Sequence, residues 1–114
     1  MAKFGTVSFT GKTNSYSFNA YNIPQEVPEE GGIYIFGIHN VNANTITPVY
    51  IGMAQSFQDR FYNHHKKDCI TKAGANCICL MNVKDEKQRT IIEKDLLAGY
   101  ATKCNEVLNP VTPK

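Results

Sequence analysis

Two tyrosines lie in short β-prone runs, within the tripeptides Gly32-Ile33-Tyr34 and Tyr50-Ile51-Gly52. The segment between the runs is short enough for two strands to lie side by side, which would put both phenols on neighbouring strands. An arginine, a histidine, a carboxylate and an amide follow, in the order Arg60, His64, Glu93 and Asn105. These residue types together suggest hydrolysis of a phosphodiester bond.

That reaction requires a nucleophilic water, a stabilised pentacoordinate phosphorus and a leaving oxygen that is protonated or bound to metal. A divalent cation supplies charge and lowers the pKa of water, and Mg²⁺ uses one or two protein carboxylates. Arginine matches phosphate oxygens with its planar fork, while tyrosine and histidine can transfer protons or orient water. The sequence therefore offers a group for each of these tasks.

In this order and spacing, the six residues resemble the GIY-YIG nuclease family, over roughly Gly31 to Pro110. The resemblance implies a catalytic set that consists of Tyr34, Tyr50, Arg60, His64, Glu93 and Asn105. It also implies that Glu93 holds one Mg²⁺ or Mn²⁺ ion and that Arg60 clamps the phosphate. Tyr34 would position or deprotonate the attacking water, alone or with His64. Because a phenol has an unperturbed pKa of about 10, a hydrogen-bond relay to metal-bound water is the more conservative role for Tyr34.

Two features depart from the family pattern. Thr102 stands where a proline often precedes the asparagine by three residues, which leaves the turn geometry before Asn105 open. An N-terminal hairpin predicted over Thr6–Tyr21 lies outside the family core, and it resembles an addition seen in small stand-alone bacterial members.

Taken singly, each residue of the set also has an ordinary structural interpretation. Tyrosines in strands are more often core or interface aromatics, and a glutamate on an amphipathic helix is usually solvated. Arg60 and His64 would serve equally well as an exposed pair four residues apart, and Asn105 as a residue at a helix end or turn. Only the joint arrangement favours catalysis.

Positive charge is concentrated between residues 60 and 72, although the net charge of the chain is only +2. In this segment a single acid, Asp68, faces four cations that we predict to contact nucleic acid: Arg60, Lys66, Lys67 and Lys72. A basic patch of this kind suits phosphate contact. On charge alone a solvated helix face is favoured, so the patch supports nucleic-acid binding only together with the catalytic set.

Residue patterns predict strands, and turn residues separate them. The expected strands are Thr6–Thr10, Ser15–Tyr21, Ile33–Ile38, Val49–Ile51 and Cys77–Val83, with a polar loop over His39–Thr47. One helix is expected to start at Ser56 and to bury Phe57 and Phe61. A second helix is expected from a capping box at Asp85 and Gln88 to about Tyr100.

The order of elements predicts an α+β fold: a small, mostly antiparallel sheet with a three-stranded core, flanked by helices and extended by an N-terminal β-hairpin. At 114 residues the chain is expected to form one domain. Within it, residues 1–30 would form the hairpin extension and linker, residues 31–110 the nuclease-like part, and residues 111–114 a tail.

The chain has four cysteines, and we expect their thiols to be reduced. Without a long apolar N-terminal segment or a run of ~20 apolar residues, the chain is expected to be cytoplasmic, with no membrane partner. A zinc site is the weaker alternative, built from His64, His65, Cys69, Cys77 and Cys79. The spacing of Cys77 and Cys79 is tighter than in usual structural zinc sites, and in a strand both would point to one face as small buried hydrophobes.

The leading hypothesis is a divalent-metal-dependent nuclease, with DNA preferred to RNA as the expected substrate. Family relatives such as homing endonucleases and the incision subunit of bacterial excision repair carry separate targeting domains. This protein would instead depend on a targeting partner protein, on nucleic-acid structure or on low selectivity. One alternative is a non-catalytic nucleic-acid-binding module on the same fold. Another is a protein-interaction domain that pairs its hairpin edge with a strand of a partner.

Overall fold

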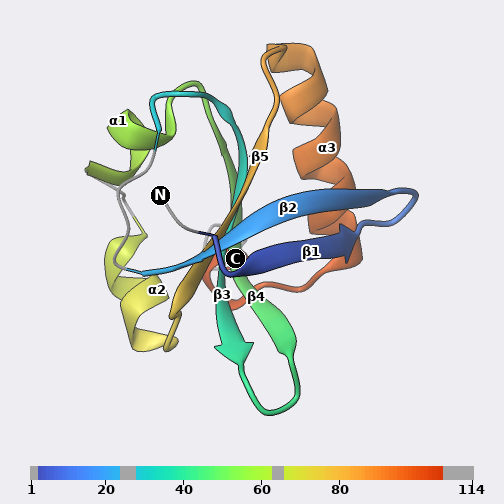
Figure 1. The fold of residues 1–114 in the computed structure, drawn as a ribbon. Coiled ribbons are helices and arrows are strands. Elements are labelled where there is room, and N and C mark those ends of the chain that lie inside the picture. The colour runs from blue at the N-terminus through green and yellow to red at the C-terminus, as the bar shows by residue number, and fades with distance from the viewer. Residues whose placement is uncertain (1–2, 24–27, 63–65, 107–114) are drawn as a thin grey trace, which may run out of the picture.

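The computed structural model describes residues 3–23, 28–62 and 66–106. Within them the chain is an α+β protein with one five-stranded antiparallel sheet in the order β1-β2-β5-β3-β4. The strands are β1 (Gly5–Thr10), β2 (Ser15–Asn22), β3 (Gly32–Asn40), β4 (Thr45–Ala54) and β5 (Cys77–Asn82). The helices are α1 (Phe57–Tyr62), α2 (Lys67–Lys72), α3 (Glu86–Gly99) and α4 (Lys103–Glu106). In Figure 1 the β1–β2 hairpin crosses in front of the other strands, with α3 on one side and α1 and α2 on the other.

Side chains alternate between the two faces of the sheet, and each face has its own core. On the α3 face, strand residues pack against Ile92 and Leu96 of α3: Phe9, Phe18, Ala20, Ile33, Ile35, Ile51, Cys77 and Cys79. On the opposite face, which we call the tyrosine face, α1, α2 and α4 contribute Phe57, Ile70 and Cys104. The strand residues buried there are Tyr21, Tyr34, Val49, Tyr50, Ala54, Ile78 and Leu80. Ile92 and Leu96 are the buried residues through which α3 packs on the sheet.

The predicted N-terminal hairpin is confirmed, and it belongs to the main sheet. β2 pairs antiparallel with β5, so the sheet is larger than the three-stranded core of the prediction. The hairpin turn also binds α3 through the carboxylate of Asp95. This carboxylate accepts hydrogen bonds from the backbone and hydroxyl of Thr13, both at 2.9 Å, from the backbone of Asn14 at 3.1 Å and from the hydroxyl of Tyr16 at 2.8 Å. The turn and the helix are thereby held together.

The predicted polar loop over His39–Thr47 is wrong at both ends. β3 continues to Asn40 and β4 begins at Thr45, so that residues 41–44 alone connect the strands. His39 pairs with Ile46 across the hairpin, and Asn44 takes the left-handed conformation, with φ of 53°. Asparagine tolerates that conformation well. Cross-strand pairing, which local polarity does not reveal, sets the strand length here.

The two main helices begin where the sequence predicts, but only one is capped as expected. The backbone N–H of Asp59 donates to Ser56 Oγ at 3.4 Å at the start of α1, whereas Asp85 makes no side-chain capping bond to α3. The buried Arg89 instead donates from Nη1 to the carbonyls of Val83 and Lys84, at 3.0 and 2.9 Å. The side chain of Phe61 lies outside the described residues. None of the helices described is long and apolar enough to cross a membrane.

The expectation of reduced thiols is wrong for two of the four cysteines. Cys69 of α2 and Cys104 of α4 form a disulfide, with Cα atoms 5.8 Å apart. Their sequence separation of 35 hides the pairing, which arises because α2 and α4 meet on the tyrosine face. Cys77 and Cys79 are free thiols buried in the α3 face. The cysteines of the alternative zinc site are therefore split between the two faces, and its histidines lie outside the described residues.

Candidate active site

The register of β3 and β4 brings the two tyrosines together. Tyr34 pairs with Gly52 and Phe36 with Tyr50, so the two phenols are diagonal neighbours on one face of the sheet. Their rings stack with centroids 5.9 Å apart and an interplanar angle of 29°. Tyr34 is 0% exposed and Tyr50 is 5% exposed. The predicted juxtaposition of the phenols is confirmed.

Glycine at position 52 makes room for this pair. A Cβ atom there would lie 2.6 Å from both Cζ and the hydroxyl of Tyr34, and 2.9 Å from Cε2 of Tyr50. Gly32 is required for a different reason, because a Cβ atom there would collide with the backbone carbonyl oxygen of Met81 on β5. Gly52 thus makes room for the tyrosine rings, and Gly32 allows β3 to lie close to β5.

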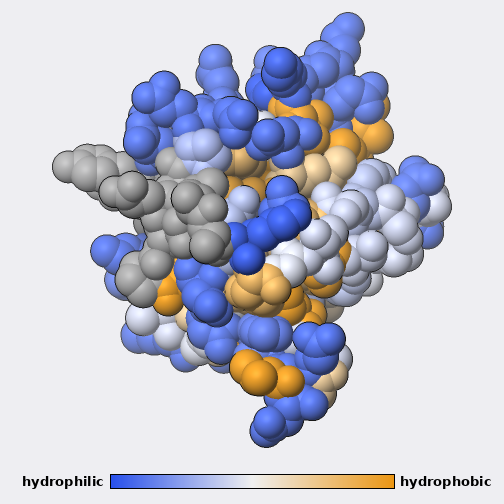
Figure 2. Space-filling view, in the orientation of Figure 1, coloured by the Kyte–Doolittle hydropathy of each residue, from blue (hydrophilic) through white to orange (hydrophobic). Residues whose placement is uncertain are grey.

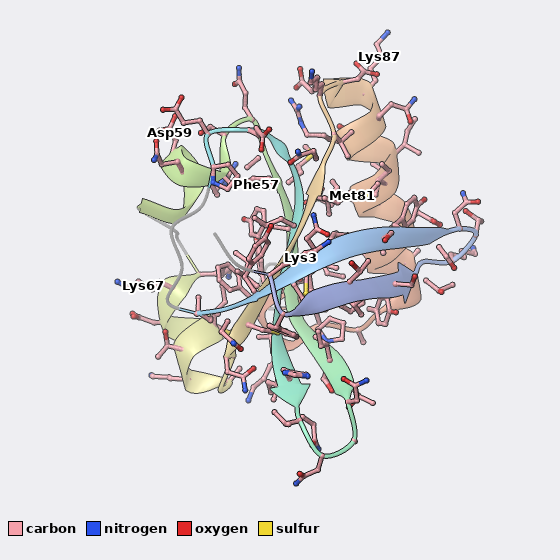
Figure 3. The ribbon with its side chains drawn as sticks, in the orientation of Figure 1. Lys3, Phe57, Asp59, Lys67, Met81 and Lys87 are labelled. Atoms are coloured by element: carbon pink, nitrogen blue, oxygen red, sulfur yellow. A yellow bond between two sulfur atoms is a disulfide. The ribbon has the colours of Figure 1, made fainter. Side chains whose placement is uncertain are left out.

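We group Arg60 of α1 and Glu93 of α3 with the tyrosines as a four-residue cluster, because their charges reach both phenols. Both charges act electrostatically on Tyr34 and Tyr50, and Arg60 also acts on Glu93. Arg60 is exposed and Glu93 is partly buried. In Figure 3, Phe57 of α1 points inward and Asp59 points away from the sheet. Four elements, β3, β4, α1 and α3, therefore each bring one member to the cluster.

Burial dominates the protonation of the tyrosines. It raises the pKa of Tyr34 far above the ordinary range, the charges of Tyr50 and Glu93 add to this, and Arg60 opposes it. Burial also raises the pKa of Tyr50, although a hydrogen bond with Tyr34 lowers it in part. A phenol that stays protonated cannot act as a base at neutral pH. The burial of Tyr34 therefore favours the protonated phenol, which can both donate and accept a hydrogen bond.

Glu93 is the carboxylate of this cluster. Desolvation raises its pKa, and the positive charge of Arg60 opposes that shift. Among the residues described, no three His, Cys, Asp or Glu side chains gather as a metal cluster. Mg²⁺ keeps several water ligands and uses one or two protein carboxylates, so Glu93 could serve as a single protein ligand.

Asn105 binds the backbone of the strand that carries Tyr50. Its Nδ2 donates to the carbonyl of Ile51 at 3.0 Å, and the Ile51 N–H donates to its Oδ1 at 2.7 Å. The buried hydroxyl of Thr102 donates to the same Oδ1. Thr102, which replaces the proline of the family pattern, thus helps to orient the amide. Asn105 acts on the strand next to Tyr50, as a positioning residue.

The four cations that we predicted to contact nucleic acid lie on α1 and at α2. Lys67 and Lys72 are exposed on α2, and Lys66 precedes that helix. An open cavity of about 550 Å³ lies beside Arg60, lined by Gln55, Ser56, Asp59 and Arg60. His64 lies outside the described residues. The structure thus gives Arg60 an accessible space large enough for a phosphate group.

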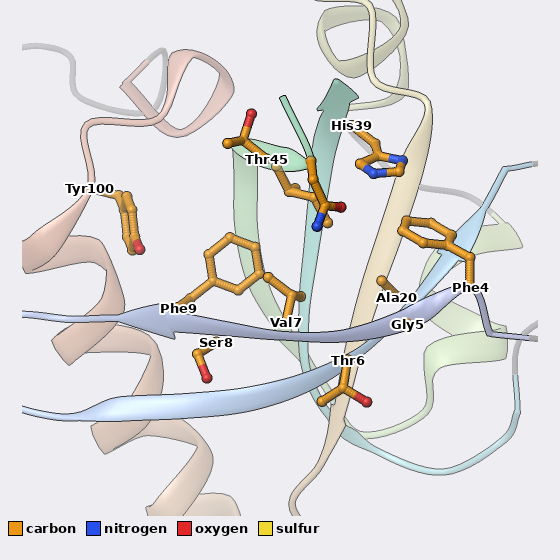
Figure 4. A pocket seen from close by; sticks show the side chains of 12 residues that line it. Phe4, Gly5, Thr6, Val7, Ser8, Phe9, Ala20, His39, Thr45 and Tyr100 are labelled. Atoms are coloured by element: carbon orange, nitrogen blue, oxygen red, sulfur yellow. The ribbon is translucent and has the colours of Figure 1, made fainter. Parts of the chain in front are cut away.

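A separate cavity lies on the α3 face, between β1 and the far end of the β3–β4 hairpin (Figure 4). Its volume is about 470 Å³, and the rings of Phe4 and His39 stack at its wall with centroids 4.5 Å apart. Tyr100 closes the other end, where its hydroxyl accepts a hydrogen bond from the backbone of Thr10 at 3.1 Å. None of the described residues that line this cavity carries a carboxylate.

The sequence did not reveal two structural contacts made by charged side chains. Arg89 is buried against backbone carbonyls, and Asp95 holds the hairpin turn. Both lie on α3 among other charged residues, and no local spacing distinguishes them from solvated ones. The role of Asp95 depends on the tertiary approach of the hairpin, whereas Arg89 folds back onto carbonyls five and six residues before it.

No protein-family model, curated protein or solved structure matches this chain. The likeness to the GIY-YIG family rests on the six residues and their order in the sequence.

Proposed function

We propose that this protein is a divalent-metal-dependent nuclease of the GIY-YIG type, which hydrolyses phosphodiester bonds in DNA rather than RNA. The observation that supports this best is the convergence of Tyr34, Tyr50, Arg60 and Glu93 from four elements. Partial burial of a carboxylate beside two phenols is costly, and such perturbed groups concentrate at functional sites. The assignment of β5, β3 and β4 as the core of that family belongs to the same proposal.

Each member of the cluster has a role that follows from its surroundings. Glu93 would hold one Mg²⁺ or Mn²⁺ ion, which when bound supplies charge and a water of lowered pKa. Arg60 donates hydrogen bonds to the non-bridging oxygens of the phosphate as negative charge develops there. Tyr34 stays protonated and relays hydrogen bonds between Tyr50 and water. His64 is included in the proposed catalytic set because of its position in the sequence, since it lies outside the described residues.

The cations of α2 support substrate attraction. Lys66, Lys67 and Lys72 would add to the positive potential around Arg60 and draw a polyanion to the site. These contacts carry no sequence information. A targeting partner protein therefore remains part of the proposal. The expected cytoplasmic location stays a prediction, and the Cys69–Cys104 disulfide weighs against a reducing compartment, where such bonds are rare.

The deciding experiment is cleavage of single-stranded, duplex and branched DNA and RNA with Mg²⁺ or Mn²⁺. Glu93→Gln is compared with Glu86→Gln, which changes an exposed carboxylate in the first turn of the same helix. We expect Glu93→Gln to lose at least about a hundredfold in rate while keeping its fold, since a preorganised electrostatic group is removed. Glu86→Gln should cleave as the wild type does.

A fully active Glu93→Gln variant would contradict the metal assignment. Wild-type protein that binds nucleic acid in a salt-sensitive way without cutting it would favour the non-catalytic binding module. Protein that neither binds nor cuts nucleic acid would favour the interaction domain, since β1 lies at an edge of the sheet.

A further inference from the structure

The outer face of the N-terminal hairpin is polar and fully exposed. Alternate residues of β1 and β2 point to the tyrosine face, and they carry hydroxyl or amide groups: Thr6, Ser8, Thr10, Ser15, Ser17 and Asn19. We call this set the hydroxyl face. In Figure 2 a pale band of weakly hydrophilic residues covers the hairpin on the side towards the viewer. The residues between them, such as Phe9 and Phe18, are buried on the other side.

The hydroxyl face is in register with the candidate active site. Thr6 pairs with Asn19, Asn19 with Leu80, and Leu80 with Tyr34, so one row crosses the sheet from its β1 edge to β3. Neighbouring strands lie about 4.8 Å apart. Asn19 is therefore about 10 Å from Tyr34 along the sheet, and Thr6 about 14 Å. At 3.4 Å of helix axis per nucleotide, that row corresponds to about four base-pair steps of a duplex.

The charge of this region suits a polyanion. Residues 1–25 include two lysines and no Asp or Glu. The ammonium of Lys3 lies over the row, where it donates to Thr6 Oγ1 at 3.4 Å and to Asn19 Oδ1 at 3.1 Å. Figure 3 shows Lys3 near the middle of the visible face. The hairpin turn also contacts one acidic residue, Asp95 of α3, whose carboxylate accepts hydrogen bonds from Thr13, Asn14 and Tyr16.

A groove borders the hydroxyl face at β2. Its volume is about 310 Å³, and its described lining includes Ser17, Asn19 and Leu80 together with Pro28 and Glu30. The carbonyls of Pro28 and Glu30 accept hydrogen bonds from the first residues of α1, at 3.1 and 2.9 Å. Glu30 is the acidic group on the wall of this groove, so the path for phosphate lies on the β2 side.

We propose that the hydroxyl face binds the sugar–phosphate backbone of the substrate strand next to the cleaved bond. This inference rests on the nuclease function proposed above, and it assigns the hairpin a role in substrate binding. Serine, threonine and asparagine side chains are common phosphate and sugar ligands, and such contacts fix register without reading sequence. Lys3 adds the charge, and the groove continues the face from β2 onto β5.

The test places a negative charge on the face. Asn19→Glu is compared with Asn42→Glu, an identical change at an exposed position in the β3–β4 turn. Ser17→Glu is a second variant of the face, and circular dichroism checks that all three fold. Each is assayed for kcat and KM on the nucleic acid that the wild type cleaves best. The face variants should raise KM about tenfold or more at low salt and leave kcat within about twofold, since they remove backbone contacts but no reacting group.

The outcomes separate this inference from the function on which it rests. If the wild type cleaves and both face variants keep the KM of Asn42→Glu, the hydroxyl face does not bind substrate, and the nuclease assignment stands. If kcat falls while KM is unchanged, the hairpin positions the site and does not bind the strand. If the wild type neither cleaves nor binds any nucleic acid, both proposals fail together.

Discussion

The two faces of the sheet are built from the same strands, but they carry side chains of different kinds. The α3 face is closed by apolar side chains such as Phe18, Ile33 and Ile35, all at most 1% exposed. The tyrosine face buries a phenol pair beside Arg60 and Glu93, and it is held by a disulfide and by the amide of Asn105. Because side chains alternate along each strand, neighbouring residues can separate stability from chemistry. Substitutions on the two faces should therefore differ in kind.

The largest expected effect is on the α3 face. Phe18→Ala should lower the free energy of unfolding by about 3–5 kcal/mol, since it empties a buried aromatic site against Phe9. The matched control is Ser17→Ala, one residue away on the exposed face, which should stay within about 0.5 kcal/mol. Denaturant titration measures both. Equal effects of the two substitutions would show that the faces are not divided as described.

The next effect concerns the covalent link on the tyrosine face. Replacing Cys69 and Cys104 by serine should cost about 3–4 kcal/mol, the chain-entropy effect of a link across 35 positions. The same loss should follow when a dithiol reduces the wild type, and the double variant should not respond to that reductant. Stability that is unchanged after full reduction would mean that packing alone holds α2 and α4.

A smaller effect is expected at the glycine under the tyrosine rings. Gly52→Ala should cost about 1–3 kcal/mol because its Cβ would lie 2.6 Å from the ring of Tyr34. It should also reduce cleavage, since the ring must move. Gly5→Ala is the control, because a Cβ atom there has no neighbour within 4 Å. An active, stable Gly52→Ala protein would rule out a fixed ring position as a requirement.

The smallest effect is at the contact between hairpin and α3. Desolvation tends to raise the pKa of Asp95, but hydrogen bonds from Tyr16, Thr13 and Asn14 outweigh it and lower the pKa below its usual value. The stabilisation is therefore present above the unfolded pKa of about 3.9 and is lost as the pH falls through the folded value. The stability difference between wild type and Asp95→Asn should be constant near neutral pH and should shrink below about pH 4. A difference that is independent of pH would mean that the charge of Asp95 plays no part.

Local pattern was sufficient for much of the fold. Alternation and turn residues predicted the hairpin at Thr6–Tyr21, and glycine-flanked β-branched runs predicted the pairing that brings Tyr34 and Tyr50 together. The pairing of β2 with β5, the disulfide and the contacts of Asp95 are non-local. They depend on which surfaces meet after the chain folds, and spacing along the chain does not encode that.

For the candidate site, the sequence predicted most of the residues but not all of their contacts. Order and spacing selected Tyr34, Tyr50, Arg60 and Glu93, which the structure brings together. Asn105 was placed with them, but its contacts are to the backbone of Ile51. An asparagine near a helix end has the same appearance in a sequence whether it faces a substrate or a strand. The direction of its amide is set by Thr102, which lies outside any local strand or helix pattern.

β4 is an outer strand of the sheet, and one asparagine side chain closes part of it. An amide side chain carries the same N–H and C=O pair as a peptide unit, so Asn105 imitates a neighbouring strand that is one residue long. An open edge at this position would accept a strand from another molecule directly beside the tyrosines. The single amide thus occupies the N–H and C=O of Ile51, which at an open edge would be free to pair with a strand of another molecule.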